Sequence, residues 1–267
     1  MRKIPAAILG ATGVVGQRFI QMLAEHPWFE IIALVGSERS AGRTYAEASR
    51  WVIPGNPPEH VNEMPILPLD ASIPGRVAFS ALPVDVARQI EPRLAEAGFA
   101  VCSNAATFRL EPDVPVIIPE VNGDHIALLE EQHKNRGWKG LIVTSPNCTT
   151  TGIVMALKPL HQAYEVERFM AVSFQAISGA GHPGVPFLDA SDNLIPFIQG
   201  EEEKIERESR ALLGCMRNGR RVDAEIIISA QSNRAPVLHG HTICLSVGFK
   251  HKPSPQEAIE TLSLIHI

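Results

Sequence analysis

The segment that most constrains the fold of this chain is a glycine-rich turn between an apolar run and a helical pattern. The apolar run covers Ile4–Leu9, and the next seven residues, Gly10–Gly16, follow the pattern G-x-x-G-x-x-G. Glycines at a strand-to-helix turn permit a tight bend and let the backbone approach a pyrophosphate at the helix N-terminus. Because a second apolar run follows at Ile31–Val35, the pattern predicts the first βαβ unit of a dinucleotide-binding domain.

The helix after these glycines is expected to bury one face, and the turn itself is expected to hold the cofactor. The helix residues predicted to be buried are Phe19, Ile20, Met22 and Leu23. The residues predicted to contact the cofactor at the turn are Gly10, Thr12, Gly13, Val14 and Val15.

Apolar and helical patterns continue to alternate along the first half of the chain. Further strands are predicted at Val77–Pro83, Ala100–Asn104, Val114–Pro119 and Leu141–Thr144. Helices are predicted over Val84–Gly98 and roughly Asp124–Lys134, whereas Arg43–Pro74 contains several prolines and indicates an excursion with loops. Such alternation is typical of a mostly parallel sheet. The end of the strand that begins at Val77 should face the cofactor, which makes Ser80 and Leu82 candidate cofactor contacts.

The residues after the second strand bear on the choice between NAD and NADP. An acidic residue there binds the ribose 2′-hydroxyl of NAD, but this chain continues with Gly36-Ser37-Glu38-Arg39-Ser40. Ser37, Arg39 and Ser40 can donate hydrogen bonds to a 2′-phosphate, and Arg39 adds a positive charge. We therefore expect NADP. Glu38 keeps NAD open if its carboxylate points at the ribose, and a solvated turn with incidental charges is a further alternative.

Composition and charge argue against several other classes of protein. The formal net charge is −5 and no Lys/Arg-rich run occurs, which argues against nucleic-acid binding. No apolar stretch reaches the length of a membrane span, and the N-terminus leads into a short strand instead of a signal-peptide core. The cysteines are scattered without a C-x-x-C pair, which argues against a zinc site and a disulfide framework. We expect a cytoplasmic protein without a bound metal.

Cys148 is the strongest candidate for a reactive group. It follows the strand Leu141–Thr144 and the strand-breaking residues Pro146 and Asn147, and a helical pattern begins with the threonines after it. Cys148 should therefore lie at or near a helix N-terminus, where unpaired N–H groups and the helix dipole favour a thiolate and can hold an oxyanion. A small buried packing residue is the alternative interpretation. A cysteine beside a nicotinamide would indicate aldehyde oxidation through a thioester, or the reverse reaction.

Three segments of the second half carry polar side chains that could serve this cysteine. Gln175 lies in a predicted strand, Met170–Ile177, which runs into the glycine-containing loop Ser178–Gly184. Glu201 and Lys204 are three residues apart in a predicted helix and would share a face, suited to the amine and phosphate of one zwitterionic ligand.

The third segment precedes a predicted strand at Ile243–Phe249 and contains Arg234 and His241. Arginine suits bidentate carboxylate binding, and histidine suits proton transfer near neutral pH. His239 and His241 could also form a metal pair, but no cysteine or carboxylate cluster lies nearby to complete a site.

With these segments assembled, the chain resembles the aspartate-β-semialdehyde dehydrogenase family, in the branch typical of archaea and fungi. The resemblance extends from Ile4 to about Phe249 and rests on five motifs in the same order and spacing. These motifs are Gly10–Gly16, Ser145–Thr150, Gln175–Gly181, Glu201–Lys204 and the segment from Arg234 to Thr242.

The resemblance implies a fold and a set of roles. The fold is α/β, with a Rossmann-like NADP-binding domain over residues 1–147 and an α+β catalytic and dimerisation domain with a mixed sheet over residues 148–267. Cys148 would be the nucleophile and His241 the acid/base, with Gln175 orienting the substrate and Asn147 assisting at the oxyanion. The residues expected to bind the substrate carboxylate, amine and phosphate are Arg234, Glu201, Lys204 and Arg109. Ser178 and Gly179 are further expected cofactor contacts.

The implied reaction is the reversible, NADP-dependent conversion of aspartyl phosphate to aspartate semialdehyde and phosphate, in the biosynthesis of lysine, threonine and methionine by a homodimer or homotetramer. The ending Thr261–Ile267 does not resemble the family. Because of this difference, we expect a C-terminally truncated chain. Two alternatives stay open: a malonyl-CoA-type acyl-CoA reductase on the same scaffold, and an inactive truncated homologue that binds NADP.

Overall fold

The computed structural model describes residues 2–263, which separate into two units. One unit comprises the chain up to Pro115 together with Leu129–Ser145, and the other comprises Val116–Leu128 together with the chain from Pro146 onward. The chain therefore leaves the first unit and returns to it before the strand that precedes Cys148. Of the divergent ending, residues 264–267 lie outside the described residues.

The first unit is built on a six-stranded parallel sheet with the order β3-β2-β1-β4-β5-β6. This order, with the glycine turn after the first strand, is that of dinucleotide-binding folds, so the Rossmann-like prediction is confirmed. The strands are β1 (Ile4–Leu9), β2 (Phe29–Val35), β3 (Ile66–Leu67), β4 (Val77–Ser80), β5 (Ala100–Ser103) and β6 (Leu141–Thr144).

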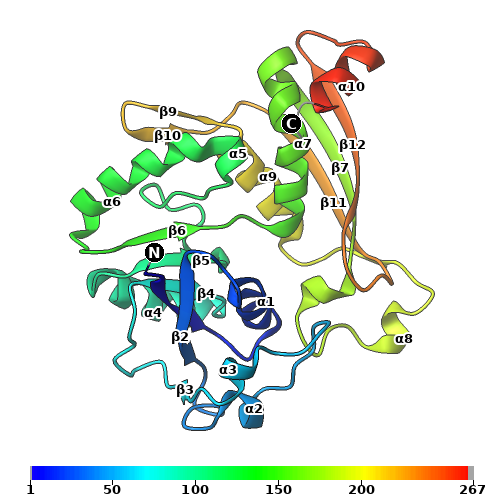
Figure 1. Cartoon of the computed structure of the whole chain (residues 1–267). Helices are drawn as coiled ribbons and strands as arrows, with labels where there is room; N and C mark the ends of the chain where they lie inside the picture. Colours follow the sequence, from blue (N-terminus) through cyan, green and yellow to red (C-terminus); the bar gives the residue numbers. More distant parts are fainter. Residues whose placement is uncertain (1, 264–267) are drawn as a thin grey trace. The chain divides into compact units, whose positions relative to one another are not determined.

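Helices cover both faces of this sheet (Figure 1). Side chains alternate along β1, so Ile8 packs with Ile20 and Leu23 of α1 (Val14–Leu23). Ala7 and Leu9 point to the other face and pack with α4 (Val84–Glu96). The remaining helices of this unit are α2 (Tyr45–Ala48), α3 (Glu59–Asn62), η1 (Ala106–Phe108) and α6 (Leu128–Arg136).

Two details of the predicted first half are wrong. Met22 is 69% exposed, because the buried stripe of α1 passes through Ile20 and Leu23 and leaves Met22 on the solvent side. The strand predicted at Val114–Pro119 does not form. Its prolines lack the N–H groups that a ladder needs, Pro119 begins the short helix α5 (Pro119–Asn122), and the Asn122 side chain bonds the backbone of Val116 and Ile118.

The second unit has a four-stranded mixed sheet with the order β12-β7-β11-β8, as the resemblance implies. The long strands are β7 (Val166–Gln175), β11 (Ile227–Arg234) and β12 (Thr242–Phe249). β11 runs parallel to β7, whereas β12 runs antiparallel to it. β11 was absent from the sequence prediction, which placed Arg234 only in the approach to the last strand.

Two helices, α7 (Cys148–Tyr164) and α9 (Glu201–Leu212), pack against one face of this sheet. Figure 1 shows both beside β7 and β11. The other elements of this unit are η2 (Gly123–Ala127), η3 (Ile177–Ala180), α8 (Phe187–Ala190), β8 (Ile195–Pro196), β9 (Cys215–Arg217), β10 (Arg220–Val222) and α10 (Pro255–Ser263).

Candidate functional site

The helix α7 begins at Cys148, as predicted. Asn147 is its N-cap: the side-chain Oδ1 accepts hydrogen bonds from the N–H groups of Thr149 at 2.9 Å and Thr150 at 3.1 Å. Pro146, which precedes the cap, has no backbone N–H to donate, and the helix does not continue on its N-terminal side. The sulfur therefore lies at the positive end of a helix dipole.

His241 lies beside this sulfur. The distance between Cys148 Sγ and His241 Nε2 is 3.2 Å. The backbone N–H of Ala176 donates to the other ring nitrogen, Nδ1, at 3.1 Å. A proton on Nδ1 would face that N–H, so the neutral ring carries its proton on Nε2, directed at the sulfur.

The electrostatic shifts of the two groups favour a thiolate. Desolvation raises the pKa of Cys148, but the hydrogen bond and charge of His241 lower it by more, so its pKa falls below the ordinary value of 9.0. The hydrogen bond to Cys148 raises the pKa of His241 above 6.5, against the opposing effect of burial. A thiolate that is stabilised in this way is the reactive form of cysteine.

Glu201 is the centre of a polar cluster behind the cysteine. Its Oε1 accepts from Asn147 Nδ2 at 2.7 Å and from Gln175 Nε2 at 3.3 Å. Its Oε2 lies 3.4 Å from the Lys204 ammonium, so these two residues share one face of α9 as predicted. Glu201 is 6% exposed and Gln175 2%, so the hydrogen bonds from Asn147 and Gln175 satisfy a carboxylate that has little access to solvent.

The register of the sheet brings Gln175, Arg234 and His241 to the same end of three neighbouring strands. Arg234 is paired with Gln175 between β11 and β7, and Thr242 is paired with Phe174 between β12 and β7. The three strands therefore place these side chains at one end of the sheet, although the sequence separates them widely.

Arg234 is held in place by the loop after β7. Its Nη1 donates to the carbonyl oxygen of Ala176 at 2.8 Å, and its side chain is buried. A Cβ at Gly179 would lie 3.0 Å from that Nη1, so a larger residue there would press on the Arg234 guanidinium; it would lie 3.7 Å from His241 Cε1, an ordinary contact. The predicted contact residues Ser178 and Gly179 thus lie in the loop that covers Arg234 and His241.

One buried acidic residue of this site has no counterpart in the sequence analysis. Glu208 of α9 accepts a hydrogen bond from the backbone N–H of Asn147, at 2.6 Å from its Oε2. It lies seven residues after Glu201, about two helical turns, and so falls on the same face. That spacing was the signal available in the sequence.

The glycine turn of the first unit fits a dinucleotide pyrophosphate. Gly10 has φ +74°, and a Cβ there would lie 2.7 Å from the carbonyl oxygen of Ala81. Gly13 is the N-cap of α1, and no side chain caps the helix. Because the first turn contains no acidic residue, the N–H groups at the helix start can donate hydrogen bonds to a bound anion.

The residues predicted to select NADP divide into two groups. Ser37, Glu38 and Arg39 are exposed at the end of β2. Ser40 is buried, and its hydroxyl donates to the Ser37 carbonyl oxygen at 2.9 Å, which shapes the turn.

The other residues proposed for ligands in this unit are buried. Ser80 and Leu82 both lie in the interior at the end of β4. Arg109 is buried too, and its Nη2 donates to the Asn104 carbonyl oxygen at 2.8 Å, so it is a fixed side chain and not a mobile surface one.

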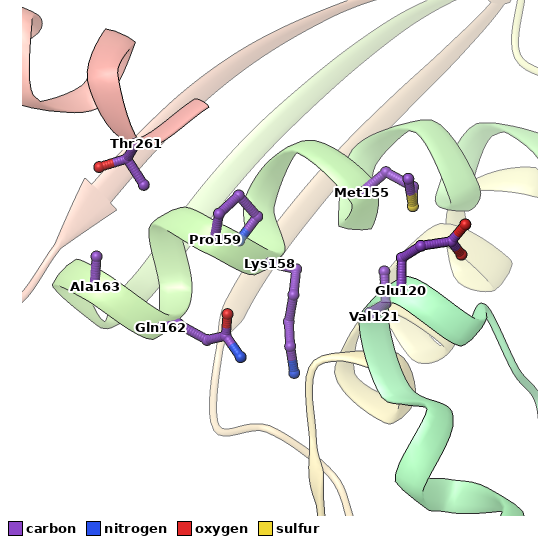
Figure 2. Close-up of a pocket in the computed structure, with 8 residues that line it drawn as sticks. All are labelled: Glu120, Val121, Met155, Lys158, Pro159, Gln162, Ala163 and Thr261. Atoms are coloured by element: carbon purple, nitrogen blue, oxygen red, sulfur yellow. The ribbon is translucent and has the colours of Figure 1, made fainter. Parts of the chain in front are cut away.

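A separate cavity of about 460 Å³ in the second unit contains none of the predicted site residues. In Figure 2, Lys158 and Gln162 extend from α7 in the same direction. Val121 of α5 and Thr261 of α10 also line it.

Residues 2–263 contain no group of three His, Cys, Asp or Glu side chains that could hold a metal ion. No helix in the same range is long and apolar enough to cross a membrane.

Comparison with known proteins finds a matching family description for most of each half of the chain. Residues 5–129 match the family described as "Semialdehyde dehydrogenase, NAD binding domain", and residues 157–266 match "Semialdehyde dehydrogenase, dimerisation domain". The aspartate-semialdehyde dehydrogenase of Archaeoglobus fulgidus is 50% identical over 253 residues, which cover 94% of this chain and 73% of that protein. The malonyl CoA reductase (NADP) of Metallosphaera sedula is 38% identical over 265 residues, 98% of this chain and 74% of that protein. Among solved structures, aspartate semialdehyde dehydrogenase with NADP from Candida albicans has a TM-score of 0.89 at 39% identity, covering 97% of this chain and 75% of that one.

Proposed function

The chain belongs to the semialdehyde dehydrogenase family, and from this membership we propose that it interconverts aspartyl phosphate and aspartate semialdehyde with NADP. The resemblance stated from the sequence is thereby confirmed. The observation that carries the chemistry is the 3.2 Å approach of Cys148 Sγ to His241 Nε2 at the start of α7. A thiolate activated by a neighbouring imidazole is suited to covalent attack on a carbonyl carbon.

The catalytic residues would act in two stages. In the oxidative direction, the Cys148 thiolate adds to the aldehyde carbon. The backbone N–H of Cys148 would hold the resulting oxyanion, because the N–H groups of Thr149 and Thr150 already donate to Asn147 Oδ1. When bound, NADP supplies the hydride acceptor. A phosphate oxygen then attacks the thioester that remains on Cys148, the carbon–sulfur bond breaks, and the thiolate is released with an acyl phosphate as product. His241 exchanges protons through Nε2, the atom that faces the sulfur.

The polar cluster supports the recognition of an amino acid. The Arg234 guanidinium is proposed to bind the substrate carboxylate, and the Glu201 carboxylate its amine. Gln175 would orient the substrate from the end of β7. Lys204 and Arg109 are proposed to hold phosphate. Asn147, whose side chain caps α7 and bonds Glu201, would assist at the oxyanion mainly by fixing the helix start.

One assay tests this function against its rivals. Purified protein is mixed with aspartate semialdehyde, phosphate and NADP, and NADPH absorbance is followed. Turnover is expected with these substrates. A parallel assay with malonyl-CoA and NADPH tests the second reaction, which the similarity to a malonyl CoA reductase makes a specific alternative. NADP binding without turnover in either assay would favour an inactive homologue.

The cofactor preference gives a prediction about Arg39. Replacing Arg39 by alanine removes a charge-assisted hydrogen bond to the 2′-phosphate, so NADP should bind about 10- to 100-fold more weakly. The affinity for NAD should stay the same, because its ribose has no 2′-phosphate. Titration of both cofactors by calorimetry measures the two effects. Equal weakening of both cofactors would contradict the proposed contact. The variant Glu38→Gln is the second arm, and it should strengthen NADP binding if Glu38 lies near the ribose.

We propose that the open face of the mixed sheet forms the surface for self-association. The strand register places Met170 beside Ser229 and Ser246 on the face away from α7 and α9. Met170 is 54% exposed and Ile227 74%, and Cys244 is exposed on the same face. An exposed sheet face that includes Met170 and Ile227, in a segment that matches a dimerisation domain, supports a homodimer, or a homotetramer built from it.

The variant Met170→Asp tests this surface. An unpaired carboxylate buried between two copies should cost at least about 2 kcal/mol, a rise of roughly 30-fold in the dissociation constant. Sedimentation velocity over a range of protein concentrations should show a shift toward monomer. Met22→Asp is the matched control, since Met22 is similarly exposed but lies in the first unit. An unchanged association of Met170→Asp would exclude this face.

We further propose that residues 1–147 carry the NADP site and residues 148–267 the catalytic and association functions. The glycine turn lies in the first segment, and the Cys148–His241 pair lies in the second. The cytoplasmic location expected from the scattered cysteines stays a prediction.

A further inference from the structure

The buried carboxylate of Glu208 has no part in the chemistry above, yet it contacts the residue that precedes the proposed nucleophile. Glu208 is 2% exposed. Its Oε2 accepts a hydrogen bond from the Asn147 backbone N–H at 2.6 Å. Bonds from an N–H to a charged acceptor are among the stronger ones in proteins, and this one is short.

The Asn147 N–H depends on an acceptor from outside α7. Asn147 is the N-cap, with φ −58° and ψ 144°, so its N–H takes no part in the hydrogen-bond ladder of the helix. Asn147 is itself 7% exposed. Because a buried N–H without an acceptor is costly, the position of this turn depends on the carboxylate opposite it.

Asn147 is held by α9 at two points that differ in their relation to the substrate. The first is Glu201, whose Oε1 accepts from Asn147 Nδ2 and whose Oε2 lies near Lys204. Glu201 is also the proposed partner of the substrate amine, so its bond to Asn147 is shared when substrate binds. The second point is Glu208, whose Oε2 accepts from the backbone N–H of Asn147 and for which no substrate group is proposed.

We propose that Glu208 is a positioning residue for the nucleophile. Its carboxylate fixes the backbone of Asn147, and through it the start of α7 and the placement of Cys148 Sγ against His241 Nε2. The inference rests on the proposed role of Cys148. It predicts that kcat depends more on the length of the side chain, which brings the acceptor oxygen to the Asn147 N–H, than on the charge of that side chain.

Two substitutions separate reach from charge. Glu208→Gln keeps an acceptor oxygen at the same reach but removes the charge, whereas Glu208→Asp keeps the charge on a side chain one methylene shorter. Glu208→Asp should lower kcat by about 10²-fold, because small displacements of a reacting group have effects of this size, with little change in KM for aspartate semialdehyde. Glu208→Gln should retain most of kcat. Glu203→Ala is the matched control, since it removes an exposed carboxylate from the same helix and should behave as wild type.

A second readout does not require turnover. The rate of alkylation of Cys148 by iodoacetamide is followed by mass spectrometry over a pH series, and melting temperatures establish that both variants are folded. Alkylation should be slower than wild type in Glu208→Asp and close to wild type in Glu208→Gln. Wild-type kcat and alkylation in Glu208→Asp, or equal loss in both variants, would overturn the proposal. If Cys148→Ala kept its turnover, the proposed function would fail, while the alkylation comparison would still report whether Glu208 positions the sulfur.

Discussion

Cys148→Ala is expected to lower turnover of aspartate semialdehyde by about 10⁴-fold or more, since loss of a nucleophile removes the covalent route entirely. NADP affinity should stay unchanged, because the glycine turn at Gly10–Gly16 belongs to the other unit. The two measurements are the rate of NADPH formation and the dissociation constant of NADP by calorimetry. Cys148→Ser should be nearly as inactive, because a serine hydroxyl is not ionised near neutral pH.

The control for this variant is Cys215→Ala. Cys215 lies on β9, away from the polar cluster around Glu201, and is a free cysteine like Cys148. Its replacement should leave the rate of NADPH formation at the wild-type value. Turnover that survives in Cys148→Ala would mean that another group attacks the substrate, and the assignment of the nucleophile would be abandoned.

His241→Ala is expected to lower kcat by about 10²- to 10⁴-fold, the usual contribution of a positioned acid/base. It should also change the pH dependence of the thiol. The pKa of Cys148 is below 9.0 because the hydrogen bond and charge of His241 outweigh desolvation. Without the imidazole, desolvation and the charge of Glu201 raise the pKa, and only the backbone N–H of Thr149 still lowers it.

The sign of the shift follows from the thiolate fraction, which rises as pH increases through the pKa. The wild-type alkylation rate of Cys148 should therefore reach half its plateau at a pH below 9.0, and the midpoint for His241→Ala should move to higher pH. His239→Ala is the matched control, since His239 is exposed and only two residues away. An unchanged midpoint in His241→Ala would show that the ring does not stabilise the thiolate.

The sequence by itself determined the features that depend on neighbouring residues. The glycine turn after β1, the periodicity of α1 and α4, and the start of α7 at Cys148 all follow from residues within a few positions of one another. Turn chemistry and helix capping act over such short distances, which is why these predictions were confirmed. The two errors in the first half, Met22 and the strand at Val114–Pro119, arose where apolar residues alone were taken as a sign of burial or of a strand.

Only the tertiary structure decided how the site is assembled. Cys148 and His241 are separated by 93 positions, and Asn147 and Glu208 by 61. Their contacts depend on the register between β7, β11 and β12 and on the packing of α9 against β11 and α7. A shift of one residue between β7 and β11 would put Gln175 and Arg234 on opposite faces of the sheet, because side chains alternate along a strand. No local pattern encodes such pairings, so the partners of Cys148 were identified from the sequence as residue types, and their geometry came from the fold.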